Sequence, residues 1–100
     1  MIKFDFNADL RFRDSLASLG AQESIDIIDS LATISAQQYS WDEFAYFYGW
    51  EPLTLPGIDI FPGANELHQF QIQGASSQRY QIIGYTYENV VIVCAIARKG

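Results

Sequence analysis

The last third of the chain, residues 67–99, constrains the fold most because it is typical of three consecutive β-strands. Strands are predicted at about residues 66–73, 78–87 and 89–98. A Gly-Ala-Ser-Ser break follows the first strand, and a Glu88-Asn89 hairpin turn follows the second. The rest of the chain is then expected to cover this sheet.

The alternation within these strands predicts how they are buried. The last strand is apolar over almost its whole length, so both of its faces should be covered and it should lie inside the sheet. In the strand before it, Tyr80 and Ile82 are expected on one face. The opposite face should carry Ile83, Tyr85 and Tyr87.

The N-terminal part predicts a strand and then a helix. Apolar and charged residues alternate over residues 2–6, which indicates a short half-buried strand. Asn7 or Asp9 can cap a helix start, since their side-chain oxygens accept hydrogen bonds from free backbone N–H groups. Gly20 is expected to end this helix.

A second helix is predicted from about Gln22 or Ser24 to Gln37, forming an antiparallel hairpin with the first. Its apolar stripe consists of Ile27, Leu31 and Ile34. Helices on one face of a sheet give an α+β fold, with the element order β-α-α-β-β-β and a single domain over residues 1–100.

Ser40 and Glu43 form a capping box that predicts a short helix ending near Tyr48. This segment is rich in aromatic residues, namely Tyr39, Trp41, Phe44, Tyr46, Phe47, Tyr48 and Trp50. A helix cannot bury seven aromatic rings on one face, so some should reach the surface. Core packing is favoured for most of them over a binding surface, because large exposed apolar patches are uncommon on monomers.

All three prolines lie in the segment Glu51–Asn65, which is expected to be an ordered loop with a short extended piece at Ile58–Phe61. Fifteen residues is long for a connection in a small domain, which indicates a functional loop.

The net charge of −6 argues against a general nucleic-acid binder, although basic residues near both ends leave a local basic patch open. Cys94 is the only cysteine, so the chain has no internal disulfide, and a free thiol fits a reducing compartment. No apolar run approaches the roughly 20 residues of a membrane helix. We therefore expect a cytoplasmic protein with no membrane contact.

No motif for a metal, a cofactor or a small-molecule substrate is present, and no Gly-rich phosphate loop is found. His68 stands without a second histidine or a cysteine nearby, which favours a structural or surface role over that of a general base.

The element order and three motifs resemble the RelE/ParE toxin superfamily, in particular its HigB and phage Gp49-like branch. Members of that branch carry a run like Leu-Tyr-Glu-Leu-Arg, then Tyr-Arg-Ile-Leu-Tyr, then an apolar strand that ends in basic residues. Here the counterparts are Leu67–Gln71 (or the run that ends at Gln73), Arg79–Tyr85 and Val91–Lys99.

The resemblance implies a ribonuclease whose strand arginines contact RNA. At those positions this chain has Gln71 or Gln73 and Gln81, which carry no charge and should bind phosphate less well. Arg79 lies one strand step away. The candidate catalytic set is therefore Arg79, Arg98 and Lys99 for phosphate, with His68, Tyr80 and Tyr85 as acid or base.

Three functions remain open. The first is a RelE/HigB-like domain, from a toxin–antitoxin or phage-encoded system, that mainly binds a protein partner such as an antitoxin or a host protein. Its contacts would come from Trp41, Phe44, Tyr48 and Trp50 together with the proline loop. The second is an active ribosome-dependent mRNA endoribonuclease. The third is an acidic inhibitor that mimics nucleic acid through the carboxylates of the second helix.

Overall fold

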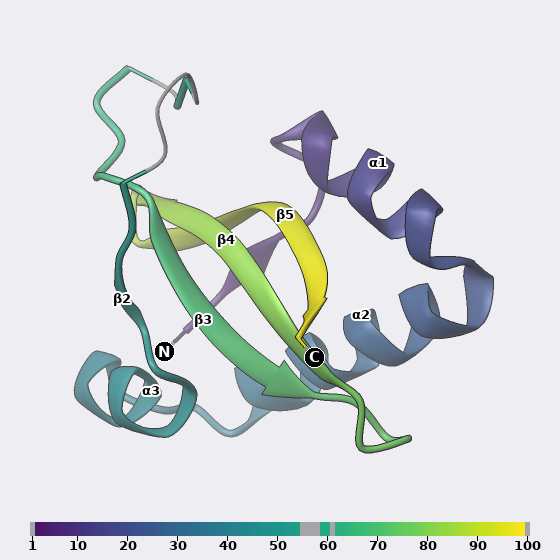
Figure 1. Ribbon diagram of the computed structural model, residues 1–100. Coiled ribbons are helices and arrows are strands. Elements are labelled where there is room, and N and C mark those ends of the chain that lie inside the picture. The colour runs from purple at the N-terminus through teal and green to yellow at the C-terminus, as the bar shows by residue number, and fades with distance from the viewer. Residues whose placement is uncertain (1, 55–58, 61, 100) are drawn as a thin grey trace.

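Five strands form one mixed sheet in the computed structural model, which describes residues 2–54, 59–60 and 62–99 (Figure 1). The strands are β1 (Phe4–Asp5), β2 (Glu51–Pro52), β3 (His68–Gln73), β4 (Arg79–Tyr87) and β5 (Val90–Lys99). Their order across the sheet is β1-β5-β4-β3-β2. β1 pairs with β5 in parallel, whereas the other pairs are antiparallel. The α+β fold class is confirmed.

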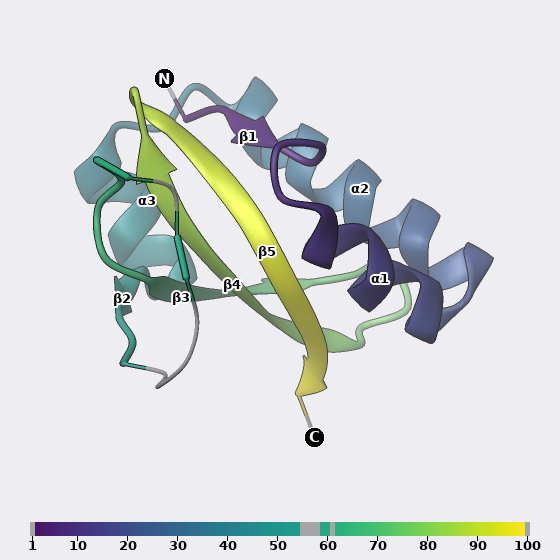
Figure 2. The same ribbon diagram turned by 90° about the horizontal axis from the view of Figure 1, so that it is seen from above.

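The helices are α1 (Leu10–Leu19), α2 (Ala21–Ala36) and α3 (Trp41–Tyr48). Asp9 caps α1 through its side chain, and the capping box predicted at the start of α3 is present. Gly20, with φ of 93°, both ends α1 and precedes α2. The second helix therefore begins at Ala21, slightly earlier than predicted, and α1 and α2 run back along each other (Figure 2).

The helices contribute their buried side chains to one main core on one face of the sheet. From the helices this core takes Phe12, Ile27, Leu31, Ile34 and Phe44. From the sheet it takes Phe70, Ile72, Tyr80, Ile82, Val91, Val93 and Ile96. On the opposite face, Ala8, Ile60 and Ala64 pack against a smaller buried cluster that includes Tyr85, Ile92 and Cys94.

The β4–β5 hairpin matches the sequence prediction closely. Glu88 and Asn89 both have positive φ, 50° and 65°, which is the geometry that a two-residue loop between twisted strands requires. The register shifts next to Gly84, where a Cβ atom would lie 2.7 Å from the backbone oxygen of Ile92. Glycine is therefore required for this irregularity, which leaves Tyr80 and Ile82 on one face and Ile83, Tyr85 and Tyr87 on the other, as predicted.

The structure differs from the predicted loop Glu51–Asn65 at the start of the segment. Its first two residues form β2, because Glu51 and Pro52 pair with Gln69 and His68. Pro52 can occupy this place because β2 is an edge strand. Of the extended piece predicted at Ile58–Phe61, residues 58 and 61 lie outside the described residues, and Asp59 and Ile60 belong to no strand.

Candidate functional site

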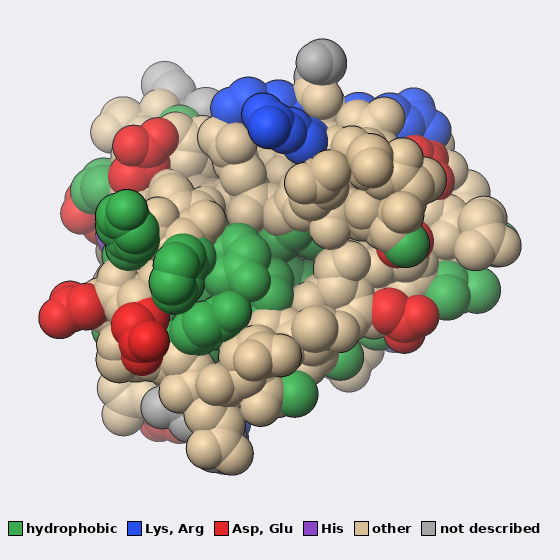
Figure 3. All heavy atoms as spheres, turned by 90° about the horizontal axis from the view of Figure 1, so that it is seen from below, with side chains coloured by type: hydrophobic (Ala, Val, Ile, Leu, Met, Phe, Trp, Pro, Cys, Tyr) green, Lys and Arg blue, Asp and Glu red, His purple; other side chains and the backbone are tan. Residues whose placement is uncertain are grey.

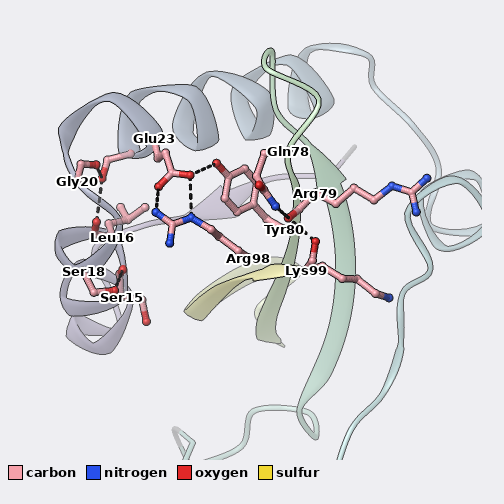
Figure 4. A network of polar contacts seen from close by, with 11 residues as sticks. Ser15, Leu16, Ser18, Gly20, Glu23, Gln78, Arg79, Tyr80, Arg98 and Lys99 are labelled. Carbon is pink, nitrogen blue, oxygen red and sulfur yellow. Dashed lines mark hydrogen bonds and ion pairs between the residues drawn. The ribbon is translucent and has the colours of Figure 1, made fainter.

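One carboxylate of α2 binds two of the predicted catalytic residues (Figure 4). The Tyr80 hydroxyl donates to Glu23 Oε1 at 2.9 Å, and Arg98 Nε donates to the same oxygen at 3.0 Å. Arg98 also forms an ion pair with Glu23 through its Nη2. Because Arg98 and Tyr80 are cross-strand partners, a single glutamate holds β4 and β5 against α2.

A second network of the same composition lies at the start of α1. Asp9, which is only 6% exposed, accepts from Arg11 Nε at 2.9 Å and forms an ion pair with Arg11 Nη2. The Tyr85 hydroxyl donates to Asp9 Oδ2 at 3.0 Å. Arg11 Nη2 also donates to the backbone oxygen of Asp59 at 2.8 Å. Asp9 therefore joins the helix cap, the sheet and the long loop.

These contacts argue against acid–base roles for Tyr80 and Tyr85. Both rings are fully buried. Burial and the bond to Glu23 raise the pKa of Tyr80 to about 12, and burial with the bond to Asp9 raises the pKa of Tyr85 further. Hydrogen bonds from Arg11 and from Arg98 lower the pKa values of Asp9 and Glu23, respectively. A tyrosine with such a raised pKa is poorly matched to proton transfer near neutral pH.

The side chains of Arg79 and Lys99 lie on the face of the sheet opposite to Glu23, which we call the open face. They are direct cross-strand partners on the sheet face away from α2, and Figure 4 shows both side chains extending away from Glu23. Both residues are exposed, and neither forms an ion pair within the described part of the chain. Like charges directly opposite each other lower the stability of a sheet. The pair also forms a local positive site on a protein whose net charge is −6.

The glutamines that replace the expected arginines lie on the same open face. Gln71 is paired with Gln81, and Gln73 with Arg79. Gln81 donates to the side chain of Gln69, which donates to Glu51 Oε1 at 2.8 Å. Along the described part of β3 this face therefore offers neutral hydrogen-bonding groups, and Arg79 and Lys99 add positive charge at one end.

His68 lies far from Arg79 and Lys99. Arg79 is opposite Gln73, five residues (73 − 68) further along β3 than His68, which corresponds to about 16 Å. The His68 ring stacks on Trp50, with centroids 4.5 Å apart, and its Nδ1 lies 2.9 Å from the Glu66 backbone oxygen. Since a carbonyl only accepts, Nδ1 is the protonated nitrogen. His68 is thus held at one end of the sheet, remote from the basic pair.

The four residues predicted to bind a partner divide between surface and core. Trp41 and Trp50 line a groove of about 690 Å³ that also contains His68. Tyr48 lines a smaller groove of about 240 Å³ between α3 and β3. Phe44 is fully buried and touches Phe70, so it cannot contact a partner and has to be removed from this set.

Two exposed aromatic residues had not been singled out. Tyr46 is 82% exposed and Phe47 is 58% exposed. They lie beside each other, with ring centroids 5.5 Å apart. The spacing of Trp41, Phe44 and Tyr48 puts those rings on the inner side of α3, so the same wheel would have placed Tyr46 and Phe47 outside.

Figure 3 shows hydrophobic side chains gathered on one part of the molecular surface, with acidic side chains beside them and basic side chains along the rim. The groove between α3 and β3 connects hydrophobic and basic surface, because its lining includes both Phe47 and Arg79. It contains an apolar wall, the glutamines of β3 and one cation. Such a lining suits a polypeptide with both apolar and acidic groups.

Within the described residues, no group of three or more histidine, cysteine or acidic side chains is placed to hold a metal ion. None of the described helices is long and apolar enough to cross a membrane. Cys94 is buried, and burial raises the pKa of its thiol to about 11. No protein-family model, curated protein or solved structure matches the chain.

Proposed function

We propose that the chain is a RelE/HigB-like domain that acts mainly by binding a protein partner in the cytoplasm, with RNA-cleaving chemistry weakened or lost. The partner would be an antitoxin-like or host protein of a toxin–antitoxin or phage-encoded system. The element order fits the resemblance, with α3 and the short β2 as additions. Because a fold does not imply a function, the proposal depends on the arrangement of the side chains.

The observation that carries the proposal is the separation of the six candidate catalytic residues. Arg98 and Tyr80 bind Glu23 on the helix side, and Tyr85 binds Asp9 at the start of α1. His68 stacks on Trp50 at one end of β3, whereas Arg79 and Lys99 lie on the open face at the other end. Acid–base catalysis needs its groups within hydrogen-bonding reach of one reacting centre.

The exposed aromatic residues of α3 support binding of a protein. Tyr46 and Phe47 expose apolar area next to the groove that Tyr48 lines. Aromatic residues are enriched in the buried centres of protein interfaces. Contiguous exposed apolar side chains on a small domain indicate an interaction site. The exposed surface of α3 is therefore the proposed contact.

The second candidate, a ribosome-dependent endoribonuclease, is favoured by one observation. Arg79 and Lys99 are adjacent, exposed cations with no acidic partner among the described residues, and such a pair can bind phosphate. The acidic-mimic alternative has less support. Glu23 binds Arg98, and Asp26 accepts from the Ala75 N–H at 2.8 Å, so both face the rest of the molecule.

The first experiment is tightly controlled expression in a bacterial host, with growth and mRNA integrity followed after induction. Our proposal predicts normal growth and intact mRNA. Growth arrest with cleaved mRNA that disappears in the Arg79→Gln, Lys99→Gln double variant would establish the nuclease instead. An Arg13→Gln, Lys3→Gln variant is the matched control, because it removes the same charge elsewhere.

The second experiment measures partner capture by the purified chain from its native host. Replacement of both exposed rings, Tyr46→Ala and Phe47→Ala, should abolish capture of any specific partner. The control Leu10→Ala removes a comparably exposed apolar side chain from α1 (65% exposed) and should leave capture unchanged. Equal capture by the α3 variant and the wild type would refute the α3 surface.

A further inference from the structure

Beyond Gln69, the outer edge of β3 pairs with no strand among the described residues. β2 pairs with β3 only through Glu51 and Pro52, which lie opposite Gln69 and His68. Among the residues that the structure describes, no strand continues beside residues 70–73. An edge of this kind exposes backbone N–H and C=O groups that can pair with another chain.

The backbone groups of Gln71 and Gln73 point toward this edge. The Gly74 N–H donates to the Gln78 oxygen on the β4 side at 2.8 Å, whereas the Leu67 oxygen accepts an N–H from the chain just past β2 at 3.0 Å. In an antiparallel strand the direction alternates from residue to residue. The backbone N–H and C=O groups of Gln71 and Gln73 therefore point away from β4, and both residues are exposed.

The two sides of this edge differ in chemistry. On the helix side the groove of about 240 Å³ is lined by Phe47, Tyr48 and Ile72. On the open face, Arg79 stands directly across from Gln73 and also reaches the lining of the groove. Lys99 is the next residue in the same cross-strand row. A strand added here would have apolar surroundings on one face and cations on the other.

We propose that this edge binds an extended segment of a protein partner as an added antiparallel strand, with apolar side chains toward Phe47 and carboxylates toward Arg79. This inference rests on the proposed function and specifies how the partner docks. Strand addition gains affinity from main-chain hydrogen bonds and specificity from alternate side chains. The direction follows β2, which already pairs antiparallel along the same edge.

A carboxylate is the expected complement because Arg79 and Lys99 face each other without an acidic partner in the described part of the chain. A carboxylate would relieve their repulsion and gain charge-assisted hydrogen bonds. A second copy of this chain is a poorer occupant. Each copy carries a net charge of −6, and β3 itself offers glutamines, not carboxylates, on this face.

The pairing geometry predicts which N–H groups of the partner matter. Opposite residues of an antiparallel pair project to the same face. A partner residue opposite Gln71 or Gln73 therefore carries its side chain on the Arg79 side and directs its own N–H at β3. In a segment that alternates valine and glutamate, the glutamate N–H groups bond to β3, and the valine N–H groups face away.

The test uses a fluorescein-labelled peptide, acetyl-Thr-Val-Glu-Val-Glu-Val-Thr-amide, titrated into the full chain at low salt with fluorescence anisotropy. N-methylation of both glutamates should lower the affinity by roughly 25-fold, about fivefold for each lost hydrogen bond. N-methylation of two valines should leave it within about twofold. Equal effects of the two methylations, or no saturable binding by the parent peptide, would overturn the proposal.

Charge reversal tests the open-face side independently. Arg79→Glu should weaken binding of the glutamate peptide. It should strengthen binding of a second peptide in which lysines replace the two glutamates. Arg13→Glu changes the net charge by the same amount on α1, away from this edge, and should not reverse the preference. Circular dichroism of each variant verifies the fold. A preference that Arg79→Glu and Arg13→Glu shift equally would mean that only net charge is sensed, against the proposal.

The outcomes separate this inference from the proposed function. If the natural partner is lost on Tyr46→Ala and Phe47→Ala but the peptides show no edge dependence, partner binding stands and strand addition fails. If neither behaves as expected, both fail. If light scattering shows a dimer of the chain and the peptide does not bind, the edge serves self-association and the inference is wrong.

Discussion

Neighbouring residues of the β4–β5 hairpin have different contacts on the two faces of the sheet. On the helix side, Tyr80 and Arg98 converge on Glu23. On the open side, Arg79 and Lys99, each one residue away along its strand, have no ion-pair partner among the described residues. Strand alternation therefore places Arg98 in an ion pair with Glu23 and Arg79 on the opposite face, although each arginine lies one residue from the cross-strand partner of the other.

The same contrast occurs within α3. Phe44 is fully buried against Phe70 of β3, whereas Phe47, less than one helical turn away, is 58% exposed. Both are phenylalanines in one short helix, so intrinsic propensity cannot distinguish them. The difference lies in the direction of each side chain, and it separates residues that hold the fold from residues that are available for binding.

The largest expected effect is that of Phe44→Ala. Removal of a fully buried phenylalanine should destabilise the domain by about 4 kcal/mol, because the site loses transfer free energy and gains a cavity. Phe47→Ala should change the free energy of unfolding by no more than about 0.5 kcal/mol. Urea denaturation followed by circular dichroism measures both. Similar losses in the two variants would contradict the division between core and surface.

Asp9→Ala should come next, at about 3 kcal/mol, because it removes a helix cap and leaves the Arg11 and Tyr85 contacts without their carboxylate. Tyr85→Phe keeps the ring and removes the hydroxyl that donates to Asp9, so it should cost about 1 kcal/mol. The same denaturation experiment compares them. If Asp9→Ala costs no more than Tyr85→Phe, Asp9 does not organise this network.

The Glu23 network should contribute to stability in a pH-dependent way. The bonds from Arg98 and Tyr80 lower the pKa of Glu23 below its ordinary value of 4.5, so the carboxylate form is favoured in the folded state. Its contribution is complete above that ordinary pKa and is lost as the pH falls through the lowered one. Denaturation midpoints between pH 7 and pH 3 should therefore fall less steeply for Glu23→Gln than for the wild type.

The control for this pH profile lies on the other face of the sheet. Arg79→Gln removes a cation that contacts no carboxylate in the described residues, so it should leave the slope of stability against pH unchanged. An equal flattening by Arg79→Gln and Glu23→Gln would show that the pH dependence reports net charge and not the Glu23 network.

Much of the fold could be predicted because local signals agreed with each other. Ser40 and Glu43 predicted the start of α3, and the Glu88-Asn89 turn set the register of β4 and β5. The faces of β4 followed from simple alternation. By contrast, β2 was missed because a two-residue strand containing Pro52 has no periodicity to detect, and its pairing depends on long-range contacts with β3.

The site was less predictable because it depends on which partners meet in space. Sequence alone grouped Arg79, Arg98 and Lys99 as one phosphate-binding set, but Glu23, 75 residues from Arg98 along the chain, pairs with Arg98 and removes it from that set. Seven aromatic residues in one segment indicated both core and surface without assigning Phe44 to the former. These assignments require the packing of α2 and α3 on the sheet, which no local pattern contains.

The smallest expected effect concerns Arg79 itself. Because Arg79 and Lys99 are opposed like charges, Arg79→Gln should stabilise the domain slightly, within about 0.2–1 kcal/mol. Arg98→Gln should instead destabilise it, since Glu23 loses the cation that donates to its carboxylate and keeps only the bond from the Tyr80 hydroxyl among the contacts of this network. Urea denaturation of both variants at low salt measures the signs. Opposite signs would mean that the fold tolerates Arg79 at a cost, which is the behaviour expected of a residue kept for binding. A loss in both variants would remove the distinction between the two faces and, with it, the reason to look for an anionic partner at this edge.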